Sequence, residues 1–137
     1  MPEKNVLTVL VAENNPVAAS RLTRLLAGLG WKVDYAASGK LAIRLATLNR
    51  YDVALLNIHM PDMEGENICR KLKLLKPNHP PVILMAPQSS AGIDLSHCTA
   101  DDIVSDLNNY KDVVERCQRL AALTASARRL PELAVSA

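Results

Sequence analysis

Polar side chains that could do chemistry stand at the ends of short apolar runs in this sequence. Glu13-Asn14, Asn57 and Asp106 each follow such a run. If the fold brings the two acids Glu13 and Asp106 to the same crevice, they could hold a cation or a small ligand. The structural alternative is one solvated acid and one acid paired with a nearby lysine or amide. We favour this alternative, because paired charges are often structural.

Asn57 carries a carboxamide where a reactive site would need a charged or nucleophilic group. Deamidation would turn it into a carboxylate. We favour a different role, a polar plug that hydrogen-bonds to Asn14, because buried polar groups are normally paired.

The histidines and cysteines have no spacing typical of a metal site. Structural sites need several convergent ligands, so we expect no metal and no resident cofactor. Three widely spaced cysteines favour reduced thiols in a cytoplasmic protein. We expect Cys69 and Cys117 to be buried on helices and Cys98 to be exposed. The histidines are His59, His79 and His97.

These residues must be positioned by alternating strands and helices. Continuous β-branched runs are typical of parallel strands buried on both faces, and leucines at helical spacing separate them. Such units give a parallel sheet with right-handed crossovers. We therefore predict a flavodoxin-like three-layer α/β sandwich with strand order 2-1-3-4-5, in which ligands bind beyond the carboxyl ends of the strands. The residues at that rim are Glu13, Asn14, Asn57, Ala86 and Asp106.

The expected element bounds follow from apolar runs and from capping residues. Asn15-Pro16 and Ser38-Gly39 are typical helix starts. Leu41, Ile43, Leu45 and Leu48 are the expected apolar residues of the second helix. Residues 87–101 predict only a short or irregular helix. The strands are predicted at 6–12, 32–36, 51–58, 82–86 and 103–104, the third helix near 66–76, and a last helix at 110–129 that ends before Pro131.

Composition limits the possible functions. The chain has 137 residues, 49% of them hydrophobic, which fits one globular domain. Its net charge of +2 comes from 16 basic and 14 acidic residues, a balance that argues against nucleic acid or an anionic membrane as partner. There is no Phe, so the core must be aliphatic. No apolar run reaches the roughly 18 residues of a membrane span.

Three segments, 9–16, 51–65 and 100–106, resemble the receiver domain of two-component response regulators. The sharpest match is Tyr51-Asp52, an apolar strand, Asn57, and then Met60-Pro61 through Gly65. The similarity covers about residues 5 to 122. We therefore expect a receiver-like domain at 1–122 and a helical extension with a tail at 123–137.

The resemblance implies five side-chain roles, and this sequence departs from four of them. Receivers use an aspartate that attacks phosphorus, two acids that help hold Mg²⁺, a hydroxyl on strand four and a lysine on strand five. The matching positions here are Asn57, the pair Glu13-Asn14, Ala86 and Asp106. An amide is not the nucleophile that forms an acyl phosphate. We interpret the chain as a degenerate pseudo-receiver without the phosphoacceptor aspartate.

The expected function is therefore a non-catalytic protein-interaction module in two-component signalling that works without phosphorylation. Candidate partners are a second copy, a histidine kinase, a phosphotransfer domain or another domain of a parent protein. We expect no nucleic acid and no membrane as partner. Two alternatives stay open: a functional phosphoacceptor in a His-Asp phosphorelay, and a small-ligand sensor that uses the altered crevice.

The last predicted helix offers a candidate interface. Its second half carries apolar residues at three- and four-residue spacing, past the expected edge of the core. An exposed apolar stripe of this kind tends to mark an interaction site. The alternatives are a frayed tail or a linker helix that leads into another domain. The interface residues are Leu123, Ala127 and Leu130, with Arg128 and Arg129 at the rim.

Overall fold

Five parallel strands form the sheet of the protein, in the predicted order β2-β1-β3-β4-β5. The computed structural model describes residues 6–75, 79–86, 99–106 and 108–136, and the side chains of 126–136 fall outside the description. The arrangement is a flavodoxin-like α/β fold. Its strands are β1 (Thr8–Ala12), β2 (Lys32–Ala36), β3 (Val53–Asn57), β4 (Val82–Met85) and β5 (Asp102–Val104).

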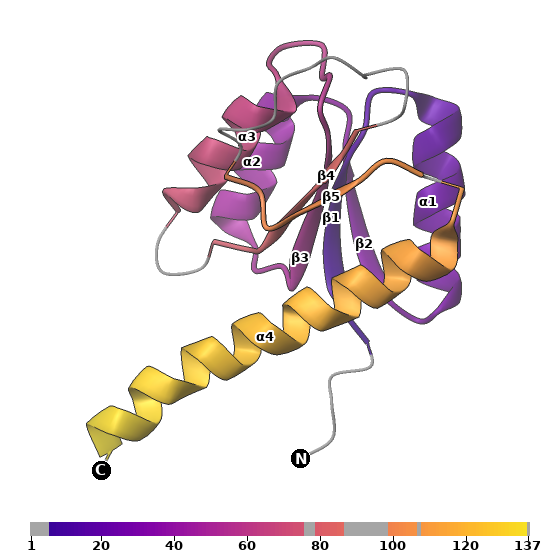
Figure 1. Ribbon diagram of the computed structural model, residues 1–137. Coiled ribbons are helices and arrows are strands. Elements are labelled where there is room, and N and C mark those ends of the chain that lie inside the picture. The colour runs from indigo at the N-terminus through magenta and orange to yellow at the C-terminus, as the bar shows by residue number, and fades with distance from the viewer. Residues whose placement is uncertain (1–5, 76–78, 87–98, 107, 137) are drawn as a thin grey trace.

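Helices cover both faces of this sheet (Figure 1). The helices α1 (Pro16–Gly28) and α4 (Tyr110–Ser136) lie on one face, and α2 (Gly39–Leu48) and α3 (Gly65–Lys73) lie on the other. Strand β1 packs in both directions, as a central parallel strand must. Its odd-numbered valines pack with α1 and α4, while Leu10 and Ala12 belong to the cluster with α2 and α3.

Capping side chains start the helices where the sequence predicts. The Asn15 side chain accepts hydrogen bonds from the backbone N–H groups of Val17 and Ala18, at 2.9 and 3.1 Å. Ser38 caps α2, and Asn109 caps α4 by accepting from the backbone N–H of Asp112 at 3.2 Å. Because α1 starts directly after β1, its cap also fixes the chain at the carboxyl edge of the sheet.

Only two of the four apolar residues expected in α2, Ile43 and Leu45, pack against the core. The helix turns Ala42 and Ala46 into the core, whereas Leu41 and Leu48 are 40% and 70% exposed. Residues four apart share one helix face, so the small pair forms the inner stripe and lets α2 pack close to α3. Ile43 and Leu45 pack against this cluster from its margin.

Two further expectations about elements differ from the structure or fall outside it. The last helix does not end before Pro131 but continues to Ser136. Proline has a helical φ angle, so the helix continues with the loss of one backbone N–H donor. The irregular helix expected at 87–101 lies mostly outside the described residues. Among the described helices, none has the length and apolar character needed to span a membrane.

Candidate functional site

Glu13 stands at the carboxyl end of β1 and is almost completely buried, with 4% of its surface exposed. Its backbone is held on the β2 side, where its N–H donates to the carbonyl of Ala36 at 3.1 Å and its carbonyl accepts from the Tyr35 hydroxyl at 2.6 Å. Its carboxylate atom Oε2 accepts from the backbone N–H groups of Asn14 at 2.8 Å and Asn15 at 3.3 Å. The side chain is therefore fixed at the rim.

Asn57 ends β3 and faces Glu13. Its amide Nδ2 donates to Glu13 Oε2 at 2.6 Å, and its Oδ1 accepts from the backbone N–H of His59 at 2.8 Å. The expected partner Asn14 is wrong, because the amide binds the acid beside it. One acceptor and one donor partner fix the amide orientation, since a carboxylate can only accept. Glu13 is thus an acid paired with a nearby amide, as in the structural alternative favoured from the sequence.

Two further rim positions, Ala86 and Asp106, carry no side-chain group that could stabilise a phosphoryl oxygen. Ala86 is buried, offers only a methyl group, and donates its backbone N–H to the carbonyl of Val104 at 2.8 Å. Asp106 is exposed, and its Oδ1 accepts from the backbone N–H of Asn108 at 3.1 Å. Asp106 therefore serves the turn before α4, a common role of aspartate.

The loop between β3 and α3 contacts the start of α2 through a residue that the sequence reasoning missed. Asp62 accepts from the backbone N–H groups of Gly39 at 2.7 Å and Lys40 at 2.9 Å. These two hydrogen bonds lower the pKa of the Asp62 carboxyl below its usual value. No spacing pattern could reveal the contact, because the partners are 23 and 22 positions apart in the chain.

The structure describes some of the cysteine and interface residues named from the sequence and leaves others outside the description. Cys69 and Cys117 are buried, as predicted, while Cys98 lies outside the described residues. Leu123 is 60% exposed on α4. The other four interface positions belong to the part of α4 whose side chains are not described.

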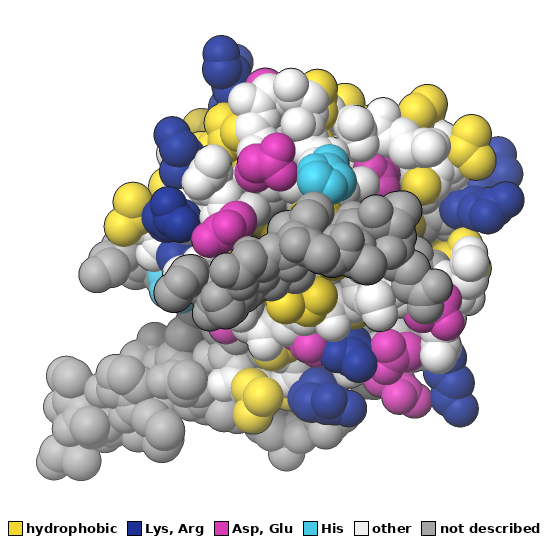
Figure 2. Space-filling view, turned by 45° about the horizontal axis from the view of Figure 1, so that its top comes forward, with side chains coloured by type: hydrophobic (Ala, Val, Ile, Leu, Met, Phe, Trp, Pro, Cys, Tyr) yellow, Lys and Arg dark blue, Asp and Glu magenta, His cyan; other side chains and the backbone are white. Residues whose placement is uncertain are grey.

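Charged side chains of both signs lie on the surface of the protein. In the face shown in Figure 2, Lys and Arg side chains are interspersed with Asp and Glu. Within the described ranges, no three His, Cys, Asp or Glu side chains are grouped so that they could hold a metal ion. Glu13 is the only rim carboxylate that points inward among the described residues, since Asp106 is exposed.

Comparison with curated proteins gives relatives in two classes of signalling protein. The probable transcriptional regulatory protein TcrX of Mycobacterium tuberculosis is 32% identical over 120 residues, which cover 86% of this chain and 51% of TcrX. The sensor protein EvgS of Escherichia coli K12 is 36% identical over 73 residues, which cover 53% of this chain and 6% of EvgS. The chain thus spans about half of one relative and a small part of the other.

Solved structures share the fold. The response regulator TrrA from Thermotoga maritima, solved in complex with Mg²⁺ and BeF, is 26% identical with a TM-score of 0.73, and the match covers 82% of this chain and 97% of that one. The receiver domain of the sensor histidine kinase PA1611 from Pseudomonas aeruginosa is 22% identical with a TM-score of 0.72, covering 82% and 98%. Residues 9–118 match the family described as the response regulator receiver domain. The chain therefore belongs to the receiver-domain family of two-component signalling.

Proposed function

We propose that this receiver domain acts as a protein-interaction module that does not depend on phosphorylation. The observation that carries the proposal is the 2.6 Å hydrogen bond from Asn57 Nδ2 to Glu13 Oε2. It places an amide donor at the position where the family resemblance requires an attacking carboxylate. An amide cannot form the acyl phosphate, so the side chain serves as a fixed structural link.

The neighbouring positions support the same conclusion. A transferred phosphoryl group needs donors and cations aimed at its oxygens. Ala86 has no polar side-chain atom, and Asp106 would add a negative charge beside a negative group. Restoring the nucleophile alone would therefore leave the charge of the phosphoryl group without compensation.

The rim residues also do not fit the Mg²⁺ ion that the fold family implies. Mg²⁺ is bound through carboxylate and phosphate oxygens in strict octahedral geometry. Here the inward carboxylate is Glu13, and its Oε2 already accepts three hydrogen bonds, from Asn14, Asn15 and Asn57. Amide groups replace the other acids at positions 14 and 57.

The test is phosphorylation by acetyl phosphate in the presence of Mg²⁺, read out as intact mass. We expect no phosphoryl adduct on the natural protein and none on Asn57→Asp alone. The combined variant Asn14→Asp/Asn57→Asp/Ala86→Thr/Asp106→Lys restores every group that the resemblance requires, and we expect it to gain one phosphoryl group. An adduct at the rim of the natural protein would refute the proposal. Rescue by Asn57→Asp alone would refute the role assigned to Ala86 and Asp106.

The partner in this proposal is a protein: a second copy, a histidine kinase, a phosphotransfer domain or another domain of a parent chain. The relatives support this class, because they are a regulatory protein and sensor proteins. We assign the receiver core to 1–122 and the extension to 123–137. The exposed Leu123 on the extension supports α4 as the interaction surface.

A further inference from the structure

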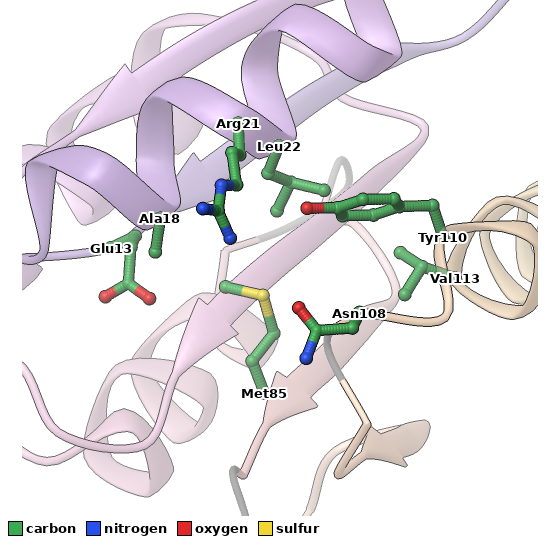
Figure 3. Close-up of a pocket in the computed structure, with 8 residues that line it drawn as sticks. All are labelled: Glu13, Ala18, Arg21, Leu22, Met85, Asn108, Tyr110 and Val113. Atoms are coloured by element: carbon green, nitrogen blue, oxygen red, sulfur yellow. The ribbon is translucent and has the colours of Figure 1, made fainter.

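A cavity of about 70 Å³ lies beside the rim, between α1, the end of β4 and the start of α4 (Figure 3). Its wall is largely apolar and is built by Ala18, Leu22, Met85 and Val113. Small-molecule sites are typically concave and apolar, with a few polar groups that fix the ligand. The polar groups at this cavity therefore decide whether it can select a ligand.

Glu13 lines this cavity, and one of its carboxylate oxygens accepts no hydrogen bond from a described residue. All three of its side-chain hydrogen bonds go to Oε2, which leaves Oε1 with no hydrogen bond from any described residue. The side chain lines the cavity and forms no ion pair with a described cation. A carboxylate that is buried to this extent is stabilised by a paired positive charge.

A positive side chain, that of Arg21, lines the same cavity. In Figure 3 the Arg21 guanidinium reaches down from α1 between Glu13 and Tyr110. Within the described part of the chain it pairs with no acid. The Asn108 amide and the Tyr110 hydroxyl line the cavity too, and both are hydrogen-bond donors.

We propose that this cavity binds a small α-amino acid with a short neutral side chain, such as glycine, alanine or serine. The ligand ammonium would donate to Glu13 Oε1, and its carboxylate would accept from Arg21, with Asn108 or Tyr110 as a further donor. One negative and one positive wall group match a zwitterion. A ligand with a single charge would be disfavoured, because Glu13 repels a lone carboxylate and Arg21 repels a lone ammonium group.

The size of the cavity sets the side-chain limit. A water molecule needs roughly 10–15 Å³ measured in the same way, so the cavity has room for about five to seven. That space suits a hydrogen, a methyl or a hydroxymethyl side chain better than an aromatic one.

The inference goes beyond the proposed function and does not rest on it. Glu13 Oε2 holds Asn57, whereas the ligand would use Oε1. Absence of amino-acid binding would leave the expected phosphorylation result unchanged. Phosphorylation of the natural protein would likewise leave the expected amino-acid binding unchanged.

The experiment is an NMR titration of the full chain, labelled with ¹⁵N, against glycine, alanine and serine. Acetate and methylammonium carry one charge each and serve as matched controls. We expect saturable shifts of backbone signals in residues 13–22 and 108–113 with at least one amino acid and none with the controls. No saturable shift with any of the three amino acids, or equal binding of acetate, would overturn the proposal.

Variants test the two charges separately. Glu13→Gln keeps an oxygen that can accept from Asn57, and we expect it to weaken binding about tenfold or more, as should Arg21→Gln. Arg24→Gln removes an arginine from the same helix outside the cavity and should bind as the natural protein does. Ala18→Leu fills the cavity without touching either charge and should abolish binding in a folded chain. Unchanged affinity in both charge variants or in Ala18→Leu would contradict the assignment.

Discussion

At the scale of single residues, the Asn57 amide links two segments at the rim. It donates to Glu13 Oε2 and accepts from the backbone N–H of His59. An aspartate at this position could still accept from His59, but it has no hydrogen to donate. It would place a second carboxylate against the buried acid. The side-chain NH₂ group of Asn57 is therefore the feature that suits position 57 to Glu13. Replacing this NH₂ group by an oxygen, as in aspartate, should destabilise the rim.

Asn57→Asp should lower the free energy of unfolding by about 1–3 kcal/mol at pH 7 without Mg²⁺, because a hydrogen bond becomes a repulsion between like charges. Urea unfolding at pH 7 measures the effect. Asn67→Asp makes the same chemical change at an exposed site and is the control. Equal effects of the two variants would contradict the assigned role of the amide.

Cys117 predicts how stability changes at alkaline pH. Burial, aided by the charge of Asp102, raises the pKa of the Cys117 thiol to about 12. The unfolded chain loses this proton near its ordinary pKa of 9.0 while the folded chain keeps it, so stability is lost as pH rises from 9.0 towards 12.

Cys117→Ala removes this contribution from both states. The variant should be less stable than the natural protein by roughly 1 kcal/mol or more at about pH 8, and the difference should narrow by about pH 11. Urea unfolding across this range measures it. A difference that stays constant would contradict a buried, protonated thiol.

At the scale of elements, the β3–α3 loop is held tightly at its end by Gly65. An added Cβ there would lie 2.5 Å from the Asn57 carbonyl oxygen and 2.7 Å from the Ile58 Cα. Both atoms belong to the backbone and cannot move aside as a side chain can. The glycine thereby lets α3 begin directly against β3, which positions Asn57.

Gly65→Ala should lower the free energy of unfolding by about 2 kcal/mol or more, because the strand or the helix must shift. Gly28→Ala is the matched control, since nothing lies within 4 Å of its added Cβ at the end of α1. We expect it to change stability by less than about 1 kcal/mol in either direction. Denaturant unfolding compares the two. Equal stability of both variants would show that the close approach at Gly65 is not required.

The sequence predicts elements better than the contacts between them. Strand order and helix caps follow from local patterns, as at Asn15. The partner of Asn57 could not be predicted this way. Its contact with Glu13 spans 44 positions, and spacing alone does not say whether Glu13 or Asn14 turns inward at the strand end. The buried face of α2 could not be predicted for a related reason, because its neighbours are close enough to favour the small side chains of Ala42 and Ala46 over Leu41 and Leu48.

At the scale of the whole molecule, α4 is the element that leaves the compact body. Its 27 residues span about 40 Å at 1.5 Å per residue. Its first part packs Val113 and Cys117 onto the sheet, and Figure 1 shows its C-terminal half extending past the sheet. Leu123 lies where the helix leaves the core and is largely exposed. The extension is therefore the surface to which we propose that a partner binds.

Self-association through this surface predicts a dimer that Leu123→Glu/Leu130→Glu converts to a monomer, because charges would enter an apolar interface. Light scattering at high micromolar concentration measures the mass. Ala122→Glu places a charge on an exposed neighbouring position and should leave the dimer intact. If the natural protein is already monomeric, self-association is wrong and the surface serves another chain.

We propose that the rim is closed to metal and phosphoryl groups, and the side-chain amide of Asn57 reports on this directly. In a ¹⁵N NMR spectrum, its two N–H signals should stay in place when Mg²⁺ and beryllofluoride, a mimic of the phosphoryl group, are added. Backbone signals should keep one set of positions, because the Ala86 side chain has no atom that could hydrogen-bond to the added group. A saturable shift of the Asn57 signals, or a second set of backbone signals that grows with Mg²⁺ and beryllofluoride, would contradict the account.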